Sequence, residues 1–140
     1  MMQFKLTDQQ KQLQETARKF AAEVMEPPSR ELDEKHEFPN AIIEQAHELG
    51  LLNLAVPEEY GGLGFSTLDQ VIIAEELAAG CVGIATSIIA NDLSFLPILI
   101  GGTDEQKKKF VQPFVERMGY SSFGLTEPNA GSDVAGMTTT

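Results

Sequence analysis

The sequence predicts a mainly α-helical fold that is followed by the first piece of a β domain. Through residue 118, apolar residues recur at the three- and four-residue spacing of amphipathic helices. After Met118 the pattern changes to alternating and turn-forming residues, which are typical of strands and hairpins. The 140 residues are 42% apolar, which suffices for one main core. We therefore expect a helical domain in residues 1–118 and the incomplete start of a β domain in residues 119–140.

The first helix is predicted to begin at Thr7, because Thr7 and Gln10 form a capping-box pattern. Pro27 and Pro28 are predicted to stop it, since proline lacks a backbone donor and its ring clashes with the preceding turn. The charged residues 29–38 would then form a surface connection.

A second helix is expected over residues 39–50, with Pro39 in its first turn and Gly50 as its C-terminal cap. Residues 51–66 read as an irregular loop. Three of its glycines are expected to adopt positive φ or to allow close backbone approach: Gly61, Gly62 and Gly64.

A third helix is predicted from Ser66 or Thr67 to Gly80, with Thr67 and Gln70 as its capping box. Its buried side chains are expected to be Leu68, Val71, Ile72, Ala74, Leu77 and Ala78.

Residues 81–102 are apolar on almost all sides, so we expect a buried central helix or helix pair that ends at Gly101 and Gly102. We expect no membrane span in the apolar stretch 84–100, because three residues break it: Asn91, Asp92 and Pro97.

A short helix with the capping box Thr103 and Gln106 should follow, broken by Pro113. Residues 119–126 and 134–140 are expected to be strands.

Composition excludes several classes of function. The formal net charge is −11, which argues against binding to nucleic acid or to anionic membranes. Cys81 is the single cysteine, so a disulfide framework and a cysteine-based zinc site are excluded, and we expect a cytoplasmic protein. His36 and His47 lack partners at metal-ligand spacing, so no metal site is predicted.

The stretch "SSFGLTEPNAGSD" over residues 121–133 offers a ligand site of small polar groups. Leu125 and Thr126, at the end of the expected strand, would present backbone N–H groups and one hydroxyl. Residues 130–132 could form a backbone nest for a phosphate or pyrophosphate. The alternative is a plain hairpin connection, because such turns are common.

Four stretches resemble the N-terminal part of the acyl-CoA dehydrogenase family: "PEEYGGLGFS", "EELA", "GGTDEQKKKF" and "FGLTEPNAGSDVAG". The resemblance covers nearly the whole chain. It implies the N-terminal helical-bundle domain of that fold and the first strands of its β-barrel-like middle domain. It also implies FAD, oxidation of an acyl-CoA thioester to the trans-2-enoyl-CoA, electron transfer to an electron-transfer flavoprotein, and a homo-oligomeric parent protein.

The resemblance further implies the site residues. The FAD contacts would be Phe123, Gly124, Leu125, Thr126, Gly131 and Ser132. The acyl-CoA contacts would be Ser132, Ala85, Thr86 and Ile89, and the absence of arginine from residues 84–92 favours an aliphatic short- or medium-chain acyl group over a dicarboxylic one. No residue matches the family's catalytic glutamate, which lies in a later domain, so we expect the 140-residue chain alone to be inactive.

Two alternatives remain. The chain could be a non-catalytic helical fragment or scaffolding module without flavin. It could also belong to an acyl-CoA oxidase or a flavin monooxygenase, which share this architecture.

Overall fold

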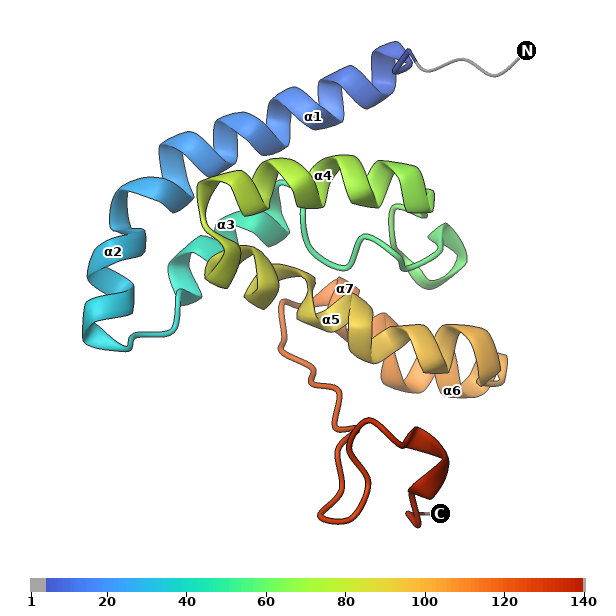
Figure 1. The fold of residues 1–140 in the computed structure, drawn as a ribbon. Helices are drawn as coiled ribbons and strands as arrows, with labels where there is room; N and C mark the ends of the chain where they lie inside the picture. The colour runs from blue at the N-terminus through green and yellow to red at the C-terminus, as the bar shows by residue number, and fades with distance from the viewer. Residues whose placement is uncertain (1–4, 140) are drawn as a thin grey trace.

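The computed structural model describes residues 5–139, and these are mainly helical, as predicted (Figure 1). The helices in chain order are α1 (Asp8–Phe20), the π-helical turn η1 (Ala21–Met25), α2 (Glu26–Lys35), α3 (Asn40–Glu48), the 3-10 turn η2 (Glu58–Tyr60), α4 (Thr67–Gly80), α5 (Val82–Gly101), α6 (Asp104–Phe110), α7 (Gln112–Glu116) and the 3-10 turn η3 (Val134–Gly136).

Helices α1 and α4 lie side by side, and their inner faces build the main core together with η1, α3 and the start of α5 (Figure 1). The fully buried members of this core include Ile43, Ile73 and Leu77. A smaller apolar cluster, built from Val56, Tyr60, Phe95 and Val111, joins the loop after α3 to α5 and to the residue between α6 and α7. Hydrophobic burial of this kind is the dominant stabilising contribution to such a fold.

The prediction that Pro27 and Pro28 stop the first helix is wrong. The helix widens into the π-helical turn η1, and the N–H of Glu26 donates to the carbonyl of Ala21, five residues earlier. The prolines then fall in the first turn of α2, where their missing N–H groups are not needed. The result is a continuous helical path through residue 35, so only residues 36–38 of the expected surface connection 29–38 are non-helical.

The α3 helix and the glycine loop after it agree with the sequence prediction. Gly50, Gly61 and Gly64 have φ of 70°, 85° and 59°, a region that favours glycine. Gly62 is required for a different reason: a Cβ there would lie 2.0 Å from the carbonyl oxygen of Val56. The loop therefore folds back on its own backbone.

The start of α4 is capped by Ser66 and Asp69, not by Thr67 and Gln70. The Ser66 hydroxyl accepts from the N–H of Asp69, and the Asp69 carboxylate accepts from the N–H of Ser66. Ile72 and Leu77 are buried as predicted, whereas Leu68 and Val71 are exposed because they lie on the face of α4 that points away from the main core.

Helix α5 is one continuous helix, in agreement with the expected central helix. Asn91, Asp92 and Pro97 lie inside it and do not shorten it below the length of a membrane span, contrary to the prediction. By length and composition alone, α5 could cross a membrane. Its Asn91 and Ser94 are buried and hydrogen-bonded to other segments, which is typical of the central helix of a folded domain. That the chain avoids membranes stays a prediction.

The C-terminal segment does not form the predicted strands within residues 5–139. Residues 118–126 are without regular structure, and residues 134–136 form the turn η3. A strand needs a neighbour for its backbone groups, and here the pairing is limited to an isolated bridge between Glu127 and Ala130. The domain boundary at residue 118 stays a prediction.

Candidate functional site

An apolar cavity of about 380 Å³ lies between α4 and α5. Two of the predicted substrate residues, Thr86 and Ile89, line it. The other lining residues are Leu54, Thr67, Gln70, Val71, Ala74, Ala90, Asp92 and Leu93. The exposed Val71 is thus part of the cavity wall. Because the wall is mostly apolar, this cavity can hold an aliphatic chain.

Ala85, the third predicted substrate residue in α5, does not line the cavity. It is 3% exposed and belongs to the main core. Its small side chain packs against the other core residues and does not reach the cavity wall. Ala85 is therefore no wall residue of this cavity, and its contact with acyl-CoA stays a prediction.

Two polar side chains of the cavity wall, Thr86 and Asp92, are already paired. Thr86 donates its hydroxyl hydrogen to the carbonyl of Val82, 2.8 Å away. The Asp92 carboxylate accepts from the backbone N–H groups of Leu54 and Ala55 at 3.1 and 2.9 Å. Burial raises the pKa of Asp92, and these two hydrogen bonds oppose the shift. Asp92 therefore ties α5 to the loop after α3, a role that the sequence did not reveal.

The predicted cofactor residues 123–126 lie on the exposed, irregular segment. Phe123 and Leu125 are 43% and 40% exposed. Within residues 5–139, neither Leu125 nor Thr126 uses its backbone N–H for a hydrogen bond, and the Thr126 hydroxyl has no partner there either. These donors are free for a ligand. No Cβ at Gly124 or Gly131 would meet an atom within 4 Å, so the protein itself does not require glycine there.

Glu127 organises the turn that follows, although the sequence prediction missed it. Its carboxylate accepts from Thr139 N at 2.9 Å and from Thr138 N and Oγ1 at 2.9 and 3.1 Å. Hydrogen bonds from Thr139 and Thr138 lower the pKa of Glu127 to about 2. The carboxylate thereby closes the loop that carries Ser132, which is exposed.

The cavity wall and the segment before residue 123 are connected by buried polar groups. Asn91 of α5 accepts from Ser121 N at 2.7 Å, and Ser94 and Ser121 bring their hydroxyl oxygens within 2.6 Å. Residues 89–93 of α5 therefore contact both the cavity and the segment that leads to residues 123–126.

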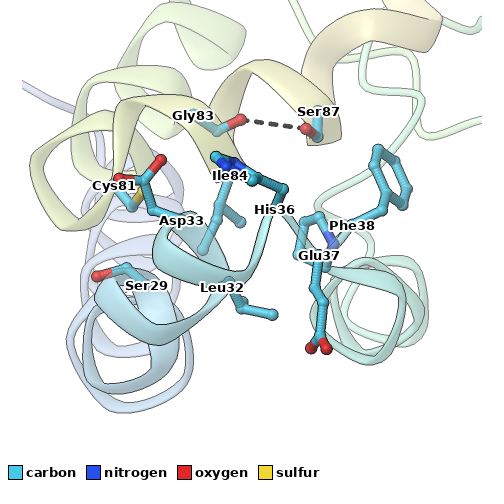
Figure 2. Close-up of a pocket in the computed structure, with 11 residues that line it drawn as sticks. Ser29, Leu32, Asp33, His36, Glu37, Phe38, Cys81, Gly83, Ile84 and Ser87 are labelled. Carbon is cyan, nitrogen blue, oxygen red and sulfur yellow. Dashed lines mark hydrogen bonds between the residues drawn. The ribbon is translucent and has the colours of Figure 1, made fainter.

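A second cavity, of about 320 Å³, lies between α2 and the start of α5 (Figure 2). Figure 2 shows Asp33, His36 and Cys81 around it. Cys81 lies in the extended break between α4 and α5 and is half-buried, instead of being inside a helix as predicted. Among the described residues, no group of three or more metal-ligating side chains occurs, here or elsewhere.

Comparison with known proteins gives a consistent result. Residues 7–117 match the domain family described as acyl-CoA dehydrogenase, N-terminal domain. The probable medium-chain specific acyl-CoA dehydrogenase 2, mitochondrial, of Caenorhabditis briggsae is 44% identical over 138 residues, which are 99% of this chain and 34% of that protein. The chain thus spans about a third of the length of this curated relative.

Two solved structures share the arrangement of helices. One is described as an electron transferring flavoprotein of Acidaminococcus fermentans, with a TM-score of 0.89 and 36% identity, over 99% of this chain and 37% of that one. The other is an acyl-CoA dehydrogenase complexed with FAD from Bacillus anthracis, with a TM-score of 0.86 and 33% identity, over 98% of this chain and 24% of that one.

Proposed function

Because the chain belongs to the acyl-CoA dehydrogenase family, we propose that it is the N-terminal part of a flavin-dependent acyl-CoA dehydrogenase. This parent protein would convert an acyl-CoA thioester to the trans-2-enoyl-CoA. The observation that carries the proposal is the apolar cavity along α5, whose wall includes Thr86 and Ile89. The same helix forms a hydrogen bond to Ser121, in the segment that leads to residues 123–126.

FAD is the proposed cofactor, and the free donors of this chain fit it. The N–H groups of Leu125 and Thr126 and the Thr126 hydroxyl would bind the edge of the flavin ring, and Phe123 and Gly124 would lie along it. Bound FAD supplies the acceptor for the hydride that leaves the β-carbon of the substrate. Hydrogen bonds from fixed donors stabilise negative charge on such a ring. Gly131 and Ser132 would contact the pyrophosphate, and Ser132 would also face the CoA moiety.

The substrate is proposed to be an aliphatic acyl-CoA of short or medium chain length. The residues that line the cavity carry no cationic side chain, so a terminal carboxylate of the substrate would have no counter-charge. Asp92 adds a like charge at the wall, which further disfavours a dicarboxylic acyl group.

The proposed electron acceptor is an electron-transfer flavoprotein, and the proposed assembly is a homo-oligomer in the cytoplasm. The relative described as an electron transferring flavoprotein supports the acceptor. Family membership supports both proposals.

The first experiment is to mix the purified chain with FAD, pass it through gel filtration and record its visible spectrum. Co-elution of the flavin band would support the cofactor site. A colourless, helical chain would mean that residues 121–140 hold FAD only together with the rest of the parent protein.

The parent protein should then be mixed anaerobically with butyryl-CoA, octanoyl-CoA and glutaryl-CoA. We expect the two aliphatic thioesters, and not glutaryl-CoA, to bleach the flavin. Absence of bleaching by every thioester would contradict the dehydrogenase proposal and favour a scaffolding module. Rapid oxygen consumption after bleaching would favour an oxidase.

A further inference from the structure

We propose that Asn91 is a positioning residue that fixes residues 119–121, and through them residues 123–126, against the wall of the α5 cavity. The geometric part of this inference stands on the hydrogen bonds alone, and its consequence for catalysis rests on the function proposed above. The observation behind it is a group of polar side chains inside the protein. Asn53, Asn91 and Ser94 are 3%, 3% and 9% exposed.

Asn91 forms hydrogen bonds on both sides of its amide. Its Nδ2 donates to Asn53 Oδ1 at 2.9 Å and to the carbonyl oxygen of Gly119 at 2.8 Å. Its Oδ1 accepts from the backbone N–H of Ser121 at 2.7 Å. The hydroxyl of Ser94 lies 2.8 Å from the Asn91 carbonyl oxygen and 2.6 Å from Ser121 Oγ. One side chain thus holds the backbone on both sides of Tyr120.

Asn53 supports this arrangement from the opposite side. Its φ is 59°, a left-handed conformation that asparagine tolerates better than most residues. In this conformation Asn53 Nδ2 donates to the carbonyl oxygen of Phe114 in α7, 2.9 Å away. The side-chain amide of Asn91 is therefore oriented by Asn53, which is itself held by its hydrogen bond to Phe114. Such a network of satisfied hydrogen bonds preorganises the residues that it connects.

The position of Asn91 in α5 gives the network its function. Its chain neighbours Ala90 and Asp92 line the apolar cavity, whereas Asn91 faces the segment at Gly119–Ser121. Ser121 lies two residues before Phe123. In the proposed function, this turn of α5 would set the distance between the acyl chain and the segment that leads to the flavin contacts. A displacement of about 1 Å between reacting groups can cost on the order of 100-fold in rate.

The geometric part is tested by amide hydrogen exchange on the chain without flavin, comparing Asn91→Ala with Ile43→Val. Ile43 is fully buried in α3, outside this network, so its variant controls for a general loss of stability. We expect the Ser121 amide to exchange at least tenfold faster in Asn91→Ala, relative to the amides of α1, and to keep its relative rate in Ile43→Val. Equal relative rates in both variants would overturn the proposal.

The catalytic part is tested in the flavin-loaded parent protein with the variants Asn91→Ala, Ser121→Pro and Ser121→Ala. Ser121→Pro removes the N–H that Asn91 accepts, whereas Ser121→Ala keeps it. We expect the first two to slow flavin reduction at saturating acyl-CoA at least tenfold, with acyl-CoA affinity changed less than threefold. Ser121→Ala should stay within threefold of the unaltered protein.

A rate within twofold of the unaltered protein for Asn91→Ala would overturn a positioning role. If the unaltered parent protein is not reduced by any acyl-CoA, the proposed function fails, and the exchange experiment alone decides whether Asn91 fixes residues 119–121.

Discussion

At the scale of single residues, Asp92 is a carboxylate whose burial disfavours its charge and whose hydrogen bonds connect two segments of the fold. Burial raises its pKa, so the charge itself is unfavourable in the folded state. Its two oxygens nevertheless accept the N–H groups of Leu54 and Ala55, which would otherwise be unpaired. The structural role of Asp92 is to pair these two backbone groups.

The substitution Asp92→Asn should therefore destabilise the chain, although it removes a buried charge. Asparagine keeps one acceptor and places an NH₂ group opposite the second backbone N–H. We expect a loss of about 1–3 kcal/mol in the free energy of unfolding, measured in urea at pH 7. A gain in stability would mean that the charge, and not the pairing, dominates at this site.

At the scale of elements, α1 and α4 are joined by polar pairs as well as by the core. Arg18 donates to both carboxylate oxygens of Glu76 at 3.0 and 2.7 Å, and Gln10 donates to Asp69 at 3.0 Å. Arg18 lowers the pKa of Glu76, and Ser66 followed by Gln10 lowers that of Asp69. Glu76 is therefore a largely buried partner of Arg18 and not a solvated surface carboxylate.

These lowered pKa values predict an acid-sensitive helix pair. A carboxylate with a lowered folded pKa contributes stability above its ordinary value, here 4.5 for Glu76 and 3.8 for Asp69. That contribution is lost as the pH falls through the folded pKa. Urea unfolding between pH 7 and pH 3 should show a decline that is shallower in Glu76→Gln. Parallel curves for the two proteins would contradict this assignment.

The contact between the end of α4 and the π-helical turn η1 depends on Gly80. A Cβ there would lie 2.9 Å from Ala21 Cβ and 3.0 Å from Ala21 O. Gly80→Ala should lower the free energy of unfolding by about 1–3 kcal/mol through overpacking, although alanine favours helices. Gly83→Ala, which would meet no atom within 4 Å, is the control and should be neutral or stabilising. Equal effects of the two variants in thermal unfolding would argue against a close contact.

At the scale of the whole molecule, α5 is central to the fold but covered on one side only. Its buried face includes Ile84, Ile88 and Phe95, whereas Leu93, Leu96 and Ile100 are 58%, 47% and 77% exposed. These three residues form a stripe at helical spacing next to the apolar cavity. Such a stripe is a site of self-association or of contact with other parts of a protein.

Polar substitution of the stripe should reduce the binding of apolar molecules to the surface more than it reduces the stability of the fold. We expect Leu93→Gln combined with Ile100→Gln to reduce binding of an apolar fluorescent dye and to leave the unfolding temperature nearly unchanged. Val82→Gln, at the other end of α5 and 68% exposed, is the control and should keep the dye signal. A large loss of thermal stability in the double variant would show that the stripe is part of the core.

Local sequence signals predicted the helices well, whereas contacts between residues that are distant in sequence were missed. The capping boxes at Thr7 and Thr103 were read correctly because each is complete within four residues. The prolines after η1 were misread because a widened turn accommodates them. The structural roles of Asn91 and Asp92 were missed, since their partners lie 28 to 38 residues away in sequence.

The candidate site was predicted in part. Thr86 and Ile89 line the cavity, whereas Ala85 packs in the main core. The free donors of Leu125 and Thr126 match the expectation drawn from the turn sequence. Glu127 was missed because its partners Thr138 and Thr139 become neighbours only when the loop closes.

The space around each glycine determines which substitutions the fold tolerates at that position. At position 62 every codon change that adds a side chain meets the carbonyl of Val56, so a library selected for folding alone should retain only glycine there. Position 124 has open space around it and should vary freely in the same library. If the proposed flavin contact is correct, a second selection for enzyme activity would restore glycine at 124. The two libraries together would distinguish glycines that are required for folding from glycines that are required for activity.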